Sequence, residues 1–351
     1  ADFTKAERLV ALNSPVMQIA MYTAMIIVSY VGAKLIINSG ASEMGVGALS
    51  SMFTYGMQIL SSLMMLSMIF VMITISNASI QRICEVLTEE STIENPENPK
   101  TDVPDGSIDF NGVSFKYHAD AEKNALTDIN LHIRSGETIG IIGGTGSSKS
   151  SLIQLISRLY DATEGEVLVG GSNVKDYDIE TLRNAVSVVL QKNVLFSGTI
   201  KENLRWGDMN ATDEELVRVC KLAQADEFIN TLPDGYDTHI EQGGTNVSGG
   251  QKQRLCIARA LLKKPKIIIF DDSTSAVDTK TDALIRNALA TEIPDTTKII
   301  IAQRISSVQD ADRVVVMEDG RINAVGTHDE LLESNEIYKE VYYSQNKAGE
   351  E

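Results

Sequence analysis

The chain has 351 residues and a formal charge of −17, from 31 basic and 48 acidic side chains. An acidic chain binds phosphate backbones poorly, which argues against a nucleic-acid partner. With 43% hydrophobic residues the chain is not disordered, and its three distant cysteines make neither a disulfide framework nor a zinc site. Because the first residue is Ala1 and not Met, we expect a fragment, a processed product or a partial chain.

Two long apolar runs fill the first 80 residues. They span residues 15–37 and 46–75, and Lys34 and Glu43 are the only charged side chains between residues 9 and 81. Each run exceeds the ~20 residues that a helix needs to cross a ~30 Å hydrocarbon core. We therefore predict a transmembrane helical hairpin in a lipid bilayer, within a membrane segment over residues 1–83. A buried hairpin of a soluble protein is the alternative.

Basic residues flank this hairpin. Lys5 and Arg8 precede the first run and Arg82 follows the second, whereas the turn between the runs has no basic residue beyond Lys34. The positive-inside rule places both ends in the cytoplasm. The sequence thus predicts a multi-pass plasma-membrane protein whose next domain is cytoplasmic.

The composition changes at Cys84. Residues 84–109 carry eight carboxylates, one base and three helix-breaking prolines, which predicts a solvated acidic linker over residues 84–107. Short apolar strands then alternate with amphipathic helices, which predicts an α/β domain with a mostly parallel sheet over residues 108–343. Residues 344–351 are polar and are predicted to be a loose tail.

A glycine-rich loop follows the apolar strand at residues 138–142, and a helical run follows the loop. This context is that of a P-loop, whose backbone N–H groups cradle phosphates. We predict that Lys149 reaches the β- and γ-phosphates of ATP and that Ser150 coordinates Mg²⁺. The pattern has Gly before the Lys, but Ser148 stands there, so we expect weakened nucleotide binding. The predicted phosphate-binding residues are Gly143, Gly144, Thr145, Gly146, Ser147, Ser148, Lys149, Ser150 and Ser151.

Two further segments complement this loop. A second apolar strand, residues 266–270, ends at Asp271, which suits a carboxylate that holds Mg²⁺ through water. Ser248, Gly249, Gly250 and Gln251 open a helix and make a second anion site. A protein with one P-loop seldom needs two such sites for one phosphate, so the second is predicted to serve another chain's nucleotide.

This set of motifs resembles the ATP-binding cassette (ABC) transporter family. Residues 247–251 are similar to its LSGGQ signature, and Gln191 looks like the Q-loop glutamine, which in the family links Mg²⁺ and water to the membrane domain. Tyr117 looks like the aromatic residue that stacks on adenine, and residues 275–278 look like the D-loop. Residues 195–204 resemble the exporter subfamily, and the hairpin looks like the last two of its six transmembrane helices. The resemblance implies a RecA-like core, an antiparallel β subdomain and a helical subdomain.

The chain departs from the family at three positions around the nucleotide. Asp272 replaces the Glu that polarises the attacking water and is one methylene shorter. Gln303 replaces the switch-loop His and cannot exchange a proton at neutral pH. Misplacing a catalytic group by ~1 Å can cost ~100-fold in rate. Because Ser148, Asp272 and Gln303 all weaken the same site, we predict that it hydrolyses ATP slowly. The candidate catalytic residues are Asp272, Gln303 and Gln191, and the candidate Mg²⁺ ligands are Ser150, Gln191 and Asp271.

The signature at residues 248–251 shows no such departure. In the family two cassettes meet head to tail, and each ATP lies between one chain's P-loop and the other chain's signature. The resemblance therefore implies a second ABC half-transporter, with a heterodimer favoured over a homodimer and with this chain holding the degenerate site of an exporter of unknown substrate. A regulatory subunit that senses ATP without transporting and a soluble-type ABC ATPase are the alternatives.

Overall fold

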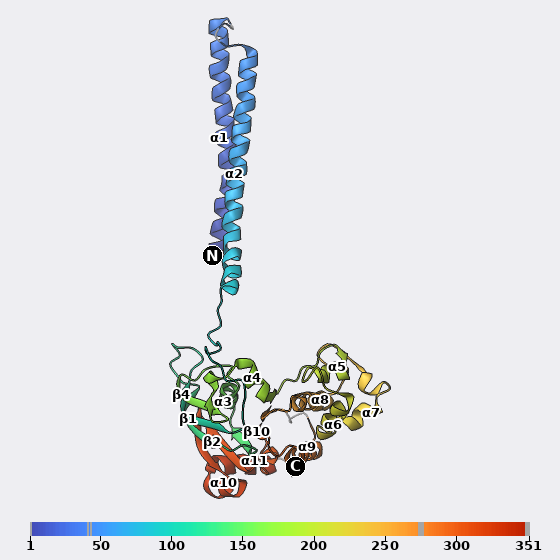
Figure 1. Cartoon of the computed structure of the whole chain (residues 1–351). Coiled ribbons are helices and arrows are strands. Elements are labelled where there is room, and N and C mark those ends of the chain that lie inside the picture. Colours follow the sequence, from blue (N-terminus) through green and yellow to red (C-terminus); the bar gives the residue numbers. More distant parts are fainter. Residues whose placement is uncertain (1, 41, 43, 273–276, 348–351) are drawn as a thin grey trace. The chain divides into compact units, whose positions relative to one another are not determined.

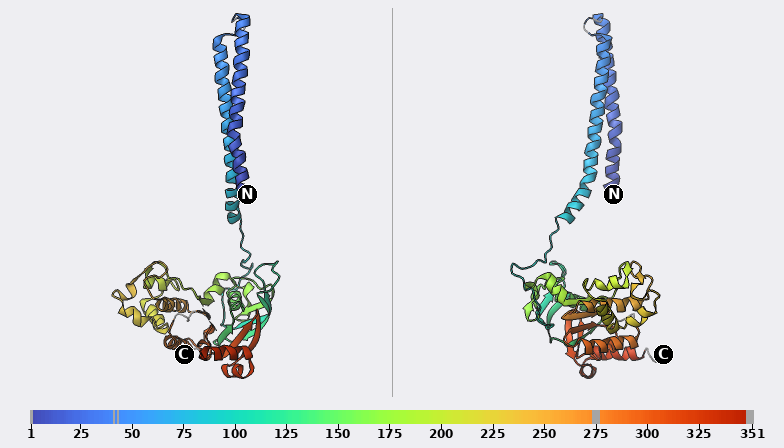
Figure 2. Two further views of the ribbon diagram at one scale, coloured as in Figure 1. Left: turned by 180° about the vertical axis from the view of Figure 1, so that it is seen from behind. Right: turned by 45° about the vertical axis from the view of Figure 1, so that its right-hand side comes forward.

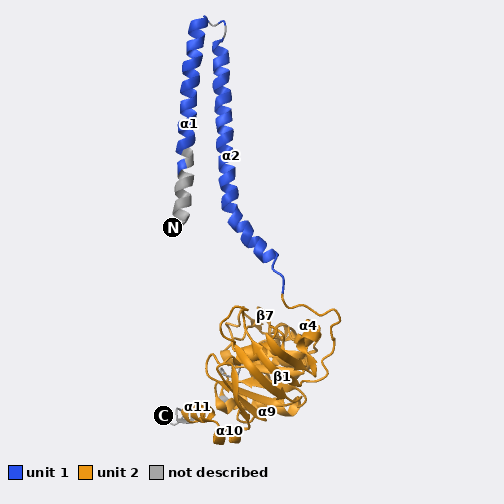
Figure 3. Cartoon of the chain, turned by 90° about the vertical axis from the view of Figure 1, so that its left-hand side faces the viewer, with its two compact units in different colours: residues 1–91 blue, residues 92–351 orange. Residues whose placement is uncertain are grey.

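The computed structural model describes residues 2–40, 42, 44–272 and 277–347 of the chain (Figure 1). The chain divides into two compact units, residues 1–91 and residues 92–351 (Figure 3).

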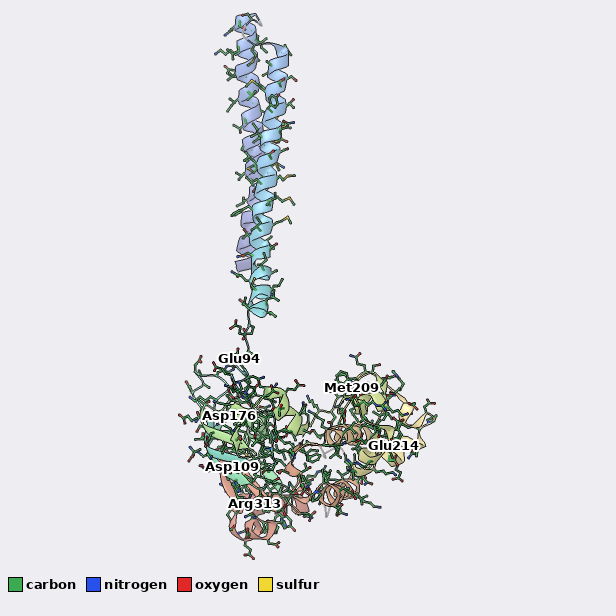
Figure 4. The ribbon with its side chains drawn as sticks, viewed as in Figure 1. Glu94, Asp109, Asp176, Met209, Glu214 and Arg313 are labelled. Atoms are coloured by element: carbon green, nitrogen blue, oxygen red, sulfur yellow. The ribbon has the colours of Figure 1, made fainter. Side chains whose placement is uncertain are left out.

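The first unit is a hairpin of two long helices, α1 (Asp2–Ser39) and α2 (Val46–Leu87). They pack closely where Gly32 meets Leu49, because a Cβ on this glycine would overlap a Leu49 methyl group. Their apolar side chains project outward (Figure 4), and none of the α2 residues is buried within the described part of the chain. Pro15–Ser39 and Val46–Leu87 are long and apolar enough to cross a membrane. This apolar surface is suited to lipid or to further helices.

The linker between the two units is shorter than the predicted linker over residues 84–107. Helix α2 continues to Leu87, and residues 92–107 belong to the second unit. Val103 is buried there, Lys100 forms a parallel bridge with Tyr177, and the Asn95 amide donates to Asp178 at 2.7 Å. The carboxylates of this segment stay exposed, whereas Val103, the Asn95 amide and the Lys100 backbone contact the rest of the second unit. Composition alone does not reveal these contacts.

A six-stranded sheet forms the centre of the second unit, in the order β12-β11-β3-β10-β9-β6. All neighbours are parallel except β11 and β12. The parallel strands read as continuous apolar runs because both faces of such a sheet are covered. The strands are β3 (Thr138–Gly143), β6 (Val186–Val189), β9 (Ile267–Asp271), β10 (Thr297–Ile301), β11 (Arg313–Glu318) and β12 (Arg321–Gly326).

A four-stranded antiparallel sheet, in the order β2-β1-β4-β5, packs on this centre through a shared apolar cluster. Its strands are β1 (Ile108–Phe115), β2 (Leu126–Ile133), β4 (Glu164–Val169) and β5 (Ser172–Asn173). A two-stranded ribbon joins β7 (Gly198–Thr199) to β8 (His239–Ile240).

Helices divide between the sheets and a separate helical lobe. The lobe contains α5 to α8 and lies beside the sheets in two views (Figures 1 and 2). Helix α11 runs through Lys347, so the predicted loose tail from residue 344 begins as helix. The helices are α3 (Lys149–Ile156), α4 (Ile179–Ala185), α5 (Ile200–Arg205), α6 (Asp213–Leu222), α7 (Asp226–Thr231), α8 (Gly249–Leu262), α9 (Thr279–Glu292), α10 (His328–Ser334) and α11 (Glu336–Lys347), with 3₁₀ turns at Val174–Asp176, Gly235–Asp237 and Ile305–Ser307.

Candidate nucleotide site

The glycine-rich loop connects the end of β3 to the start of α3. Gly143 pins the loop to β11, because a Cβ there would lie 2.3 Å from the backbone oxygen of Met317. Gly144 and Gly146 are different: among the described residues no atom lies within 4 Å of where their Cβ atoms would stand. The loop therefore combines a fixed base with an open inner surface, onto which a phosphate can approach the backbone.

Ser148 occupies the N-cap position of α3 in the left-handed region, with φ 66° and ψ 25°. Its side chain makes no capping hydrogen bond. The left-handed conformation costs an L-residue roughly 1–2 kcal/mol, whereas glycine adopts it freely. The backbone at this position is therefore the one that the family's glycine would favour.

The Lys149 ammonium group lies inside the loop. It donates to the carbonyl oxygens of Gly143 at 2.7 Å and Gly144 at 2.9 Å, and to the Ser147 hydroxyl at 3.1 Å. Burial lowers the pKa of Lys149, although the carboxylates of Asp271 and Asp272 oppose that shift. A half-buried cation whose hydrogen bonds within the described residues go to neutral groups is well placed to bind an anion.

Two oxygen groups meet at the first turn of α3. The Ser150 hydroxyl donates to Asp271 Oδ2 at 3.3 Å, and Asp271 is the last residue of β9. Burial raises the pKa of Asp271, and the nearby Asp272 charge adds to this, whereas the Ser150 hydrogen bond lowers it. The described residues include no group of three His, Cys, Asp or Glu that could hold a metal alone. A hydroxyl and one carboxylate nevertheless fit Mg²⁺, which takes its other ligands from phosphates and water.

Asp272 joins the two glutamines that were predicted with it. Its Oδ2 atom accepts from Gln191 Nε2 at 2.9 Å and from Gln303 Nε2 at 2.8 Å. The Asp272 backbone has a φ of 48°, and its N–H donates to Ile301 O at 2.9 Å. All three predicted catalytic residues therefore lie together. Gln191, which the sequence also predicts as a Mg²⁺ ligand, donates to Asp272 through its amide nitrogen.

A cavity of about 380 Å³ collects most of the predicted site. Its walls come from the ends of β3, β9 and β10, from the start of α3 and from α11. The lining residues are Ile142, Gly143, Gly144, Thr145, Gly146, Lys149, Ser150, Gln191, Asp271, Asp272, Ile301, Ala302, Gln303 and Val341.

Tyr117 lies beside the first turn of α3 and does not line this cavity. Its hydroxyl is 2.8 Å from the Ser151 hydroxyl and donates to Gln154 Oε1 at 3.1 Å. The rings of Phe115 and Tyr160 contact its ring edge to face, and 46% of the side chain remains exposed. An aromatic ring that is held in place and partly exposed can stack on a base.

The signature residues open helix α8 on the helical lobe. Ser248 accepts from the Gln251 N–H at 3.3 Å, and its own N–H donates to Gln251 Oε1 at 2.9 Å, which forms a capping box. Ser248 and Gly249 are exposed, and none of the signature residues is among those that line the cavity. The structure therefore does not bring the signature to the chain's own P-loop.

The structure describes only part of the predicted D-loop, residues 275–278. Ser275 and Ala276 of the predicted D-loop lie outside the described residues, while Asp278 caps α9 by accepting from the Thr281 N–H at 3.0 Å. Three further residues near the site or its loops belong to no sequence motif and were not predicted: Gln154, Val341 and Gln345. Helical spacing could have grouped Gln154 with Ser151, but nothing in the sequence connects α11 with residues 303–305.

The site thus has a glycine-rich loop between the parallel strand β3 and helix α3, followed by a lysine and a hydroxyl. It also has an acid at the end of β9, which β10 separates from β3. Together these features define a P-loop nucleotide-binding domain. The ABC transporter domain family matches residues 126–275. Residues 126–275 therefore form an ABC transporter domain, and over most of its length the chain is similar to known ABC transporter proteins.

Three similar proteins illustrate this relationship. YfiB of Bacillus subtilis, an uncharacterized ABC transporter ATP-binding protein, is 41% identical over 340 residues, which are 97% of this chain and 58% of YfiB. An uncharacterized ABC transporter ATP-binding protein of Mycobacterium tuberculosis is also 41% identical, over 95% of this chain and 57% of its own length. A solved bacterial Atm1-family ABC exporter with ATP bound has a TM-score of 0.79 and 30% identity, over 97% of this chain and 60% of that chain. This chain thus spans less than two thirds of these relatives.

The comparisons confirm the predicted P-loop ABC cassette preceded by apolar helices. They also confirm the resemblance to exporters. Two candidate membrane helices and the exporter neighbour indicate association with a membrane.

Proposed function

We propose that this chain belongs to the ATP-binding subunit of an ABC exporter, which couples ATP binding and hydrolysis to export across a multi-pass membrane domain. The observation that carries the proposal is the cavity in which Lys149, Ser150 and Asp271 converge on an open glycine loop. The apolar surface of α1 and α2 supports the membrane assignment, and the basic residues flanking the hairpin support a cytoplasmic cassette.

Each site residue has a defined task in this proposal. The loop N–H groups and Lys149 bind the ATP phosphates, while Ser150 and Asp271 hold Mg²⁺. When bound, Mg²⁺ neutralises the charge that develops on the phosphate oxygens. Tyr117 stacks on adenine, since its hydroxyl is held by Ser151 and Gln154 while the residue remains partly exposed.

We further propose that this site binds ATP but hydrolyses it slowly. Ser148 places a side chain where the backbone must approach a phosphate, and it does so in a backbone conformation suited to glycine. Asp272 has one oxygen already engaged by Gln191 and Gln303. Asp272 is the candidate residual base, but its shorter side chain and these two amides limit how well it can activate water.

The signature on α8 suggests a partner. It is exposed, capped and away from the chain's own P-loop, so it can bind the nucleotide of a second half-transporter. A heterodimer explains why an unmodified signature accompanies a weakened hydrolytic site, whereas a homodimer would contain two weakened sites.

Restoring the family residues tests this proposal. We expect the chain, reconstituted in vesicles, to turn over ATP slowly, and the variant S148G/D272E/Q303H to do so at least ~100-fold faster. Lys149→Ala added to the restored variant is the control and should abolish the gain. Rapid turnover by the unmodified chain alone, or no gain on restoration, would exclude a degenerate site.

A regulatory ATP sensor is the second candidate, and the same three departures favour it. Transport and regulation differ in their response to substrate: an exporter with its partner shows ATPase activity that rises with the exported compound, and a sensor does not. A soluble-type ABC ATPase is disfavoured by the exposed apolar helices.

A further inference from the structure

Helix α11 directs three side chains toward the interior of the second unit at helical spacing. Tyr338 is fully buried and its hydroxyl lies 2.8 Å from His328 Nδ1, which anchors the helix on α10. Val341, one turn further, lines the nucleotide cavity. Gln345 follows after one more turn, so positions 338, 341 and 345 share a face.

Gln345 makes two hydrogen bonds to the backbone of the switch loop, residues 302–305. Its Oε1 atom accepts from the Ile305 N–H at 2.9 Å, and its Nε2 atom donates to Gln303 O at 2.7 Å. A single side-chain amide therefore holds the loop on both sides of Arg304. The bond to the Ile305 N–H is partly buried, which strengthens it relative to an exposed one, whereas the bond to Gln303 O is exposed.

The switch loop in turn lines the nucleotide cavity, as Asp272 does. The side chain of Gln303, whose backbone oxygen Gln345 holds, donates to Asp272 Oδ2 at 2.8 Å, and the same oxygen accepts from Gln191. A continuous series of hydrogen bonds thus runs from α11 through the switch loop to Asp272 and Gln191.

We propose that Gln345 is a positioning residue, which fixes the switch loop so that Gln303 faces the nucleotide. The proposal rests on the function proposed above, because it assigns Gln303 to the γ-phosphate end of an ATP site. Within the described part of the chain, both hydrogen bonds of the Gln345 side chain go to backbone atoms, and Gln345 does not line the cavity, so it acts through Gln303 and not on the nucleotide. ADP lacks the γ-phosphate, and the loss of Gln345 should therefore affect ATP binding more than ADP binding.

Gln345→Leu in the full chain, in detergent or vesicles, tests the proposal. We expect hydrogen exchange at the Ile305 amide to become about 10-fold faster, because a neutral hydrogen bond is lost, while exchange in the P-loop stays unchanged. We also expect the affinity for Mg-ATP relative to ADP to fall about 3- to 10-fold, with ADP affinity unchanged. Gln309→Leu, an exposed glutamine four residues after Ile305, is the matched control and should change neither readout.

Gln345→Glu separates the two hydrogen bonds. The glutamate keeps an acceptor for the Ile305 N–H but places an anionic oxygen opposite Gln303 O. The Ile305 amide should therefore stay protected from hydrogen exchange, while the affinity for Mg-ATP relative to ADP falls. Unchanged Ile305 exchange in Gln345→Leu, or an equal loss of ATP and ADP affinity, would overturn the proposal. If the unmodified chain binds neither nucleotide, the proposed function fails, whereas the Ile305 exchange still decides whether Gln345 holds the loop.

Discussion

Ser148 combines a side chain with a left-handed backbone at the point where the phosphate loop enters α3. The backbone cost of roughly 1–2 kcal/mol is present without a bound nucleotide, so it lowers the stability of the fold and not the affinity for a ligand. Only the side chain itself, at the end of the loop where the family has glycine, is expected to affect nucleotide binding.

Ser148→Gly is expected to raise the affinity for Mg-ATP by about 5- to 10-fold, because it removes the side chain from the end of the phosphate loop. Titration calorimetry on the full chain measures this change. Asp319→Gly is the matched control, since Asp319 is exposed and has a φ of 45° in the β11–β12 turn, away from the cavity. An unchanged or lower affinity in Ser148→Gly would show that Ser148 does not weaken the site.

Asp271 makes the free energy of unfolding depend on pH. Its raised pKa means that the folded state holds a proton more tightly than the unfolded state. The free energy of unfolding therefore falls as the pH rises from the ordinary aspartate pKa through the raised one, and the penalty persists at neutral pH.

Asp271→Asn is expected to raise the midpoint of thermal unfolding at pH 7 by about 2–4 °C, with the difference vanishing below about pH 4. The same variant should lose Mg²⁺-dependent ATP binding, since an amide replaces the carboxylate ligand. Unfolding curves between pH 4 and 8 test this, with Asp319→Asn as an exposed control. A lower midpoint at pH 7 would contradict the assignment of a destabilising buried charge.

At the scale of elements, the phosphate loop depends on the strands that flank it. Gly143 ends β3 against the β11 backbone, whereas Gly144 faces the open cradle. The two neighbouring glycines thus serve different purposes, the first for packing and the second for ligand approach.

Gly143→Ala should destabilise the cassette by roughly 2 kcal/mol or more, because its Cβ would overlap the Met317 carbonyl oxygen and the rigid backbone cannot yield. Gly144→Ala should leave stability within about 0.5 kcal/mol and lower ATP affinity instead. Chemical unfolding with ATP titration separates the two effects. Equal loss of stability in both variants would show that the loop is not divided in this way.

At the scale of the whole molecule, the apolar helices and the acidic cassette need different surroundings. Most of the large apolar side chains of α2 are exposed, Phe70 at 72% and Ile69 at 47% among them. In contrast, the cassette buries its apolar side chains in two clusters of its own.

Phe70→Arg is expected to reduce membrane insertion of the full chain, because an arginine near the middle of a membrane helix costs about 2.5–3.5 kcal/mol. Fractionation of cells into membrane and soluble parts measures it. Glu94→Arg, an exposed substitution in the second unit, is the control and should leave the distribution unchanged (Figure 4). A chain that stays in the soluble fraction with Phe70 intact would refute the membrane assignment.

Sequence motifs predicted most residues of the candidate site, because the groups that bind a phosphate lie close together in the sequence. The loop at residues 143–150 and the strand that ends at Asp271 were predicted with their elements, since alternating apolar runs and glycines fix strand, turn and helix over short distances. Gln191 and Gln303 were predicted as site residues, but the fact that both amides share Asp272 Oδ2 depends on how β6, β9 and β10 align.

The sequence by itself determined the class of protein: an apolar hairpin followed by a P-loop cassette with three departures around the nucleotide. Only the tertiary structure decided what contacts the loops make, because such contacts join residues far apart in the chain. Gln345 shows the difference, since it belongs to a segment that composition predicts to be loose. The buried Tyr338 fixes α11 in place, and the helix then carries Gln345 to the switch loop across 40 residues of sequence.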